Sequence, residues 1–156
     1  MLNANPNSQD YFFLEPSSKV EYALLALIEM ACHPARFAPL TISEIVTKQP
    51  IPARYLEQVF TSLRRSGLVH SHRGSKGGYV LSREPWQIAL LDVVASLEGE
   101  RKEKKQPDTS TLERDVLYKI WYQANDASHR VLSRYTIQDL CQLRDERRQQ
   151  NPMYYI

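Results

Sequence analysis

The feature that most constrains this chain is the stretch of residues 51–82, which combines a helix with its own stop signal and a glycine-rich turn. Pro52 suits a first helical position, and Gly67 stands one step past the last apolar residue of the pattern. Apolar residues at helical spacing predict one buried face: Leu56, Val59, Phe60 and Leu63. The other face carries side chains that donate hydrogen bonds to phosphates or base edges: Arg54, Tyr55, Gln58, Thr61, Arg64 and Arg65.

Two short strands are predicted directly after this helix, over residues 68–73 and 79–82. Glycines between them permit the positive φ angles of a hairpin tip, which also carries Arg73 and Lys76. A helix with a basic face followed by a basic hairpin is typical of a winged helix-turn-helix. In that arrangement the helix enters the major groove of DNA, and the hairpin, or wing, lies along the adjacent backbone or minor groove.

Positive charge is concentrated in this region. Between residues 54 and 76 there are five arginines or lysines and a single carboxylate, Glu57, so the segment carries +4 while the whole chain carries +2. A solvated basic surface is the alternative interpretation of a basic helix alone. The basic hairpin attached to it favours nucleic acid as the partner.

A chain of 156 residues has room for a DNA-reading unit and an association element. It has no apolar run of about 18 residues and no secretory signal pattern, so we expect a soluble cytoplasmic protein without membrane contact. Cys32 and Cys141 are far apart in sequence, and Cys32 continues an apolar helical pattern. Neither a disulfide scaffold nor a cysteine metal site is therefore expected.

The chain divides into five predicted segments. A flexible leader covers residues 1–16, the winged helix-turn-helix 17–98, a mobile loop 99–109, a dimerisation helix with a final helix 110–145, and a tail 146–156. Capping boxes are predicted at residue pairs 18 and 21 and 41 and 44. Residues 110 and 113 are predicted to cap the next helix, and residues 136 and 139 to start the last one. Lys19 and Tyr22, in the first turn of the first helix, are positions from which phosphate contacts can come.

The helix predicted after residue 110 is apolar on more than one side. A small domain can cover only one of those sides, so we infer that the same helix of a second chain covers the other. The alternative is that the winged domain covers both sides. The residues expected at the dimer contact are Leu112, Val116, Ile120, Ala124 and Val131.

Four aromatic residues allow two interpretations: Trp86, Tyr118, Trp121 and Tyr122. They could line a small-molecule pocket between the winged domain and the dimerisation helix. Aromatic residues at helical spacing are more often core residues, which is the expectation here.

Four segments together resemble a known family: SSKVEYALLALIEMA at 17–31, residues 40–82 with YLEQ and RGSKGGY, IALLDVVASLEGE at 88–100, and VLSRYTIQDL at 131–140. They are similar to the Rrf-two family of bacterial transcriptional regulators over most of residues 17–143. The resemblance implies a mainly α fold, with a two-stranded β wing and a long C-terminal dimerisation helix that crosses to the partner subunit.

The resemblance also implies roles for individual residues. Arg54, Tyr55, Glu57 and Gln58 would occupy recognition-helix positions that contact bases or backbone, and Arg73 the wing position that enters the minor groove. Chemically, Gln58 can pair with adenine and Glu57 can accept from cytosine. Glu57 has an alternative structural role, which is to hold Arg54 or Arg65.

One departure from the family is visible. Members that bind an iron–sulfur cluster carry three cysteines in the loop that corresponds to residues 99–109, and this chain has none there. We therefore expect no cysteine-ligated cluster, no metal and no other cofactor.

These observations predict a homodimeric, sequence-specific DNA-binding transcriptional regulator, in particular a repressor, that is not an enzyme. Its partner would be a pseudo-palindromic double-stranded operator, with a protein or small-molecule effector left open. The alternative is a winged-helix module that acts mainly through a partner protein.

Overall fold

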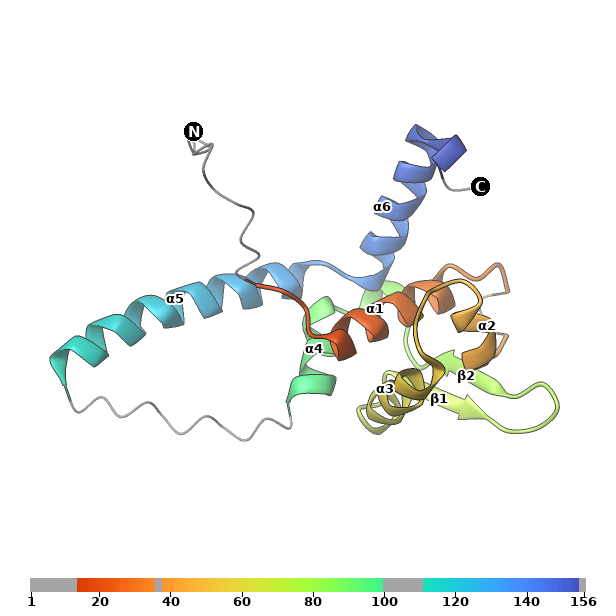
Figure 1. Ribbon diagram of the computed structural model, residues 1–156, viewed down its shortest axis with the longest axis horizontal. Coiled ribbons are helices and arrows are strands. Elements are labelled where there is room, and N and C mark those ends of the chain that lie inside the picture. The colour runs from red at the N-terminus through yellow and green to blue at the C-terminus, as the bar shows by residue number, and fades with distance from the viewer. Residues whose placement is uncertain (1–13, 36–37, 100–110, 155–156) are drawn as a thin grey trace.

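The computed structural model describes residues 14–35, 38–99 and 111–154 (Figure 1). The winged part contains α1 (Ser18–Ala31), α2 (Ile42–Val46), α3 (Ala53–Arg65), β1 (Val69–His72), β2 (Gly78–Leu81), the 3₁₀ turn η1 (Pro85–Gln87) and α4 (Leu90–Glu98). The C-terminal part contains α5 (Leu112–Arg134), α6 (Ile137–Gln150) and η2 (Pro152–Tyr154). The predicted fold class, mainly helical with a two-stranded wing and a long C-terminal helix, is confirmed.

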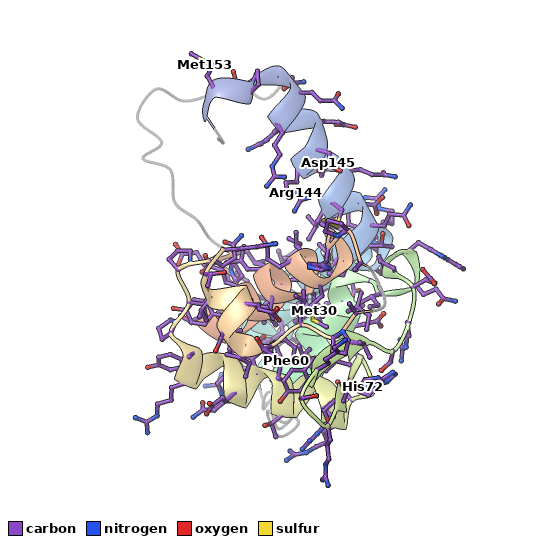
Figure 2. All side chains as sticks on the ribbon, turned by 90° about the vertical axis from the view of Figure 1, so that its right-hand side faces the viewer. Met30, Phe60, His72, Arg144, Asp145 and Met153 are labelled. Carbon is purple, nitrogen blue, oxygen red and sulfur yellow. A yellow bond between two sulfur atoms is a disulfide. The ribbon has the colours of Figure 1, made fainter. Side chains whose placement is uncertain are left out.

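One core unites the winged part with the first turn of α6. Phe60 of α3 is fully buried and stacks on Tyr79 of β2, with ring centroids 4.3 Å apart. Met30 of α1 lies in the same interior (Figure 2), and Ile137 of α6 is fully buried against it. Each such side chain stabilises the fold by about 1.5–3 kcal/mol relative to an exposed position. The core therefore fixes α3 by its apolar side and leaves its polar side outside.

Local sequence signals set most helix starts. The capping box at Thr41 with Glu44 and the helix start at Thr136 with Asp139 are confirmed, and both pairs form capping boxes, since in each the carboxylate accepts the backbone N–H of the threonine at 2.7 Å. The box predicted at residues 18 and 21 is wrong, because Ser17 is the N-cap and its hydroxyl accepts from the Val20 N–H.

Two other predicted helix starts shift by one residue. Pro52 is the N-cap of α3 and not its first helical residue. The cap of α5 is Thr111, whose hydroxyl accepts from Arg114 N–H, and residue 110 lies outside the described residues. Adjacent polar residues compete for the same cap, so the sequence pattern fixes a helix start only to within one residue.

Glycine ends α3 as predicted. Gly67 adopts a φ of 77°, its N–H donates to the Arg64 carbonyl, and the Leu68 N–H donates to the Leu63 carbonyl. This pair of bonds is a Schellman motif, which turns the chain sharply out of α3 and into β1.

The wing is tied to the rest of the domain by a second backbone pairing. Strands β1 and β2 are antiparallel with Val69 opposite Leu81, and Leu40 forms a separate bridge with Tyr79. Gly78 next to this bridge has a φ of 146°, and a Cβ there would lie 2.6 Å from the Leu40 carbonyl oxygen. Only glycine lets the segment before α2 approach β2 this closely.

Residues 85–98 do not form one continuous helix. A 3₁₀ turn ends at Gln87, Ile88 is extended, and α4 begins at Leu90. The break leaves backbone groups free to form two hydrogen bonds with the α5–α6 junction. Leu90 N–H donates to the Tyr135 carbonyl, and Ile137 N–H donates to the Ile88 carbonyl. The charged run after Leu143 continues α6 to Gln150 and is exposed apart from the partly buried Arg144.

Helix α5 projects away from the winged part (Figure 1) and has no buried residue. The alternative that the winged domain covers both of its apolar sides is therefore wrong. The prediction that the aromatics are core residues is also wrong within one chain, since Trp86, Trp121 and Tyr122 are each more than half exposed. Within the described ranges, no helix is long and apolar enough to cross a membrane.

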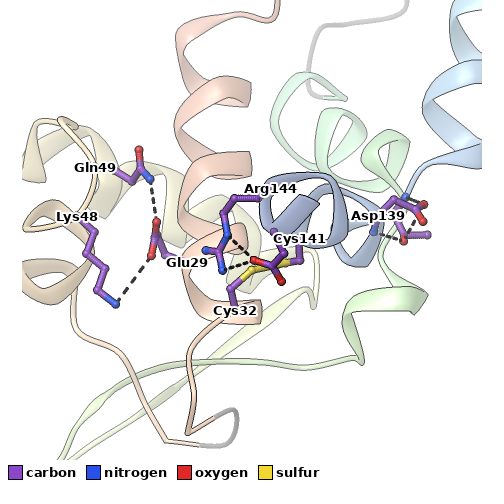
Figure 3. Close-up of a disulfide and its surroundings, with 9 residues drawn as sticks. Glu29, Cys32, Lys48, Gln49, Asp139, Cys141 and Arg144 are labelled. Carbon is purple, nitrogen blue, oxygen red and sulfur yellow. Dashed lines mark hydrogen bonds and ion pairs between the residues drawn. A yellow bond between two sulfur atoms is a disulfide. The ribbon is translucent and has the colours of Figure 1, made fainter. Parts of the chain in front are cut away.

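The expectation of no disulfide is wrong. Cys32 and Cys141 are joined by a disulfide, with their Cα atoms 6.3 Å apart (Figure 3). Cys32 is the C-cap of α1 and not an interior position of that helix, and α6 folds back to bring Cys141 beside it. Their separation of 109 residues hides this proximity from local pattern analysis.

Candidate nucleic-acid interface

Helix α3 presents a continuous polar face. Its four apolar residues are buried, which turns the opposite side of the helix outward. Every residue predicted on that side is exposed in the structure: Arg54, Tyr55, Glu57, Gln58, Thr61, Arg64 and Arg65. The Thr61 hydroxyl donates to the Glu57 carbonyl at 2.9 Å, so its proton is used in a hydrogen bond within α3.

The wing extends beside this face. Arg73 and Lys76 are exposed at the hairpin tip, and α3 and the wing lie along one edge of the molecule, from which nitrogen-tipped side chains project (Figure 2). The His70 imidazole is hydrogen bonded to the Ser82 hydroxyl at 2.7 Å, and its ring lies 6.2 Å from that of His72. Among the described residues, no group of three or more histidines, cysteines or carboxylates could hold a metal ion.

The start of α1 meets the start of α3. The Tyr22 ring lies 6.1 Å from the Tyr55 ring in a tilted arrangement, so Tyr22, which is partly buried, supports the exposed Tyr55. Lys19 is exposed one turn earlier on α1. The structure therefore brings the first turn of α1 to the N-terminal end of α3, where the partial positive charge of both helix ends favours an anion.

One positioning contact was missed by sequence reasoning. Glu29 of α1 is only 8% exposed, and its carboxylate accepts a hydrogen bond from Gln49 Nε2 at 2.8 Å. Lys48 Nζ lies 4.0 Å from the same carboxylate (Figure 3). Gln49 and Lys48 belong to the turn between α2 and α3, so this buried carboxylate connects α1 to the helix-turn-helix. A single glutamate within an apolar helical stripe was the signal available in the sequence.

These features define a class of protein. A short helix, a proline-containing turn, a second helix with an exposed basic face and an adjoining basic wing form a winged helix-turn-helix, here followed by a long apolar helix. The chain belongs to the Rrf-two (Rrf2) family, whose profile, described as "Iron-dependent Transcriptional regulator", matches residues 16–143.

Relatives of known structure share the fold. CymR of Bacillus subtilis is 34% identical over 145 residues, which cover 90% of this chain and 98% of that protein. The solved structure of this CymR, the global cysteine regulator of B. subtilis, matches with a TM-score of 0.71 over 83% of this chain and 98% of that chain, at 32% identity. IscR of T. potens matches with a TM-score of 0.69 at 32% identity, covering 92% of this chain and 98% of that chain.

The cysteines of this chain do not provide the ligand set of an iron–sulfur cluster. Such clusters are held by several thiolates or by thiolates with histidines. The chain has two cysteines, both in the disulfide between α1 and α6, and residues 99–109 contain neither cysteine nor histidine.

Proposed function

We propose that this protein is a homodimeric transcriptional repressor that binds a pseudo-palindromic operator in the bacterial cytoplasm without a cysteine-ligated cluster. The observation that carries this proposal is the exposed basic face of α3 beside the basic wing. A helix with exposed arginine, glutamine and tyrosine side chains has the width and the donors to read a major groove. Repression requires nothing further than occupation of the DNA that the dimer covers.

Contacts on this surface divide into base-reading and phosphate-binding groups. Gln58 and Glu57 lie in the exposed middle of α3 and have amide and carboxylate groups that discriminate base edges. Arg73 at the wing suits a narrow A·T-rich minor groove. The remaining side chains supply charge or hydrogen bonds to the phosphate backbone: Lys19, Tyr22, Arg54, Tyr55, Arg64, Arg65 and Lys76.

The exposed apolar surface of α5 supports the homodimer. Leu112 is 74% exposed and Ile120 58% exposed, and Val116 and Val131 are exposed on the same side. A surface of this kind on a helix that projects from its domain is suited to pack against its own copy. Two-fold symmetry would place two α3 helices about one helical turn apart on DNA, or a small multiple of it.

A small-molecule effector would fit a groove of this structure. A groove between α4 and α5 has apolar walls that include Leu91, Val94 and Trp121, together with the polar side chains of Glu98 and His129. This composition suits a small molecule with an apolar body and a polar group. Part of the aromatic set expected in the core, Trp121, faces this groove.

The proposal is tested by selecting duplexes from a randomised DNA pool and measuring binding of the recovered sequence over a salt series. We expect a palindromic consensus, and affinity that falls steeply with salt because phosphate contacts release counterions. A protein that recovers no consensus and shows no affinity for duplex DNA at low salt would instead be the winged-helix module that acts through a partner protein.

A further inference from the structure

The C-terminal end of α1 is covalently joined to α6. Cys32 caps α1, and its N–H donates to the Ile28 carbonyl at 2.9 Å. Cys141 lies in the second turn of α6, and the disulfide between them brings the two helices together (Figure 3). Both residues are partly exposed.

The same end of α1 also contacts the helix-turn-helix. Glu29 lies one turn before Cys32 on α1, and its carboxylate receives the hydrogen bond of Gln49 from the turn before α3. After Cys32 the chain leads to Leu40, which pairs with Tyr79 of the wing. The last turn of α1 is therefore a joint between α6 on one side and the DNA-facing elements on the other.

Within the part of the chain that the structure describes, the other anchors of α6 lie near its start. Ile137 is buried, its N–H donates to the Ile88 carbonyl, and Thr136 bridges Ala89. Leu140 packs on the core, while residues 142–150 are exposed apart from the partly buried Arg144. Beyond the disulfide, the described residues of α6 are thus mostly exposed as the helix leaves the body of the domain.

We propose that Cys32 and Cys141 are a reversible oxidation site that controls DNA binding. The disulfide form clamps α6 onto α1 and keeps the last turn of α1, and through Glu29 the turn before α3, in the arrangement that binds DNA. The dithiol form releases α6, loosens this joint and binds DNA more weakly. This inference rests on the proposed function.

The chemistry is a thiol–disulfide exchange with a low-molecular-weight disulfide, such as glutathione disulfide, as oxidant. One cysteine thiolate attacks the oxidant, forms a mixed disulfide and displaces one thiolate. The other cysteine then attacks the protein sulfur of that mixed disulfide and displaces the second thiolate. One S–S bond breaks and one forms, two electrons pass to the sulfurs of the oxidant, and the two thiol protons end on the released thiols.

The test compares the full chain after equilibration in oxidised and in reduced glutathione. Affinity for the duplex recovered by selection is measured at one fixed salt concentration, and free thiols are counted by alkylation and mass spectrometry. We expect about 10-fold tighter binding by the oxidised form, within the usual range of coupling between two sites. Cys32→Ser and Cys141→Ser should each bind with the weaker affinity in both buffers.

A second variant tests the contact between Glu29 and Gln49 without changing the cysteines. Gln49→Ala removes the hydrogen bond to Glu29 and leaves both cysteines in place, so the disulfide should still form while the affinity difference between the two forms shrinks. Equal affinity of the two wild-type forms, tighter binding by the reduced form, or thiols that stay free in oxidised glutathione would each overturn the inference.

Amide hydrogen exchange tests the clamp without DNA. The oxidised form should protect amides in α6 and in residues 47–51 more strongly than the reduced form, and the serine variants should resemble the reduced form. If neither form binds DNA, the proposed function fails while this readout still decides the clamp. Unchanged protection in both regions would reject the clamp even where DNA binding is intact.

Discussion

Gln58 and Arg64 lie on the same exposed face of α3 but offer different chemistry to DNA. The Gln58 amide can donate to and accept from an adenine edge, whereas the Arg64 guanidinium carries a charge that any phosphate satisfies. We expect Gln58→Ala to cost about 1–3 kcal/mol at one base pair and to relax preference there. Arg64→Ala should weaken binding evenly across sequences and reduce the salt dependence. Competition gel shifts with single-base variants of the selected duplex measure both effects, and equal loss by Gln58→Ala on all duplexes would reject the base-reading role.

The structure also explains why residue 78 is a glycine. An alanine there combines an unfavourable φ of 146° with a Cβ at 2.6 Å from the Leu40 carbonyl oxygen. We expect Gly78→Ala to lower the free energy of unfolding by more than about 2 kcal/mol, measured by urea denaturation. Gly67→Ala is the matched control, because Gly67 also has a positive φ but no atom within 4 Å of its Cβ position. That control should cost about 1 kcal/mol, and equal losses in the two variants would contradict the close approach at the wing.

At the scale of single elements, α2 depends on its capping box. The backbone N–H of Thr41 and then its hydroxyl, both donating to the Glu44 carboxylate, hold the pKa of Glu44 below its ordinary value. A lowered folded-state pKa means that the ionised carboxylate stabilises the fold above the unfolded pKa and that this stability disappears as pH falls through the folded pKa. We expect Glu44→Gln to remove this part of the acid dependence of the unfolding midpoint, which appears below about pH 4.3.

Thr41→Ala distinguishes the contribution of the capping hydroxyl from that of the Glu44 carboxylate. It removes the hydroxyl that accepts from the Glu44 N–H but keeps the Thr41 backbone N–H, which is the larger cause of the pKa shift. This variant should lose about 1 kcal/mol of stability and keep most of the acid dependence. If Glu44→Gln and the wild-type chain show parallel pH profiles, the capping carboxylate does not contribute in this way.

The elements also show what the sequence could predict. The stop of α3 at Gly67 and the boxes at Thr41 and Thr136 depend on residues three or four apart, so their patterns are visible locally. The exposed face of α3 follows from its buried stripe for the same reason. The break at Ile88 and the disulfide of Cys32 depend on contacts with the α5–α6 region, which only the folded chain brings near. The Glu29 contact with the turn before α3 likewise joins two helices and has no local pattern.

At the scale of the whole molecule, the proposed homodimer is expected to cover the exposed apolar residues of α5. Ile120 lies within the apolar side of this helix and is 58% exposed in the single chain. A glutamate there would be buried without a partner in the dimer, so Ile120→Glu should raise the dimer dissociation constant at least about 30-fold, equivalent to ~2 kcal/mol.

Asp126→Lys provides the control for this dimer prediction. Asp126 is exposed and lies about a third of a turn around α5 from Ile120. Sedimentation equilibrium should show monomers for Ile120→Glu at concentrations where the wild-type chain and Asp126→Lys are dimers. Operator affinity should fall in parallel with dimer loss, since each half-site then binds one winged domain alone. A wild-type chain that sediments as a monomer at every concentration would contradict the symmetric arrangement of two α3 helices on one duplex.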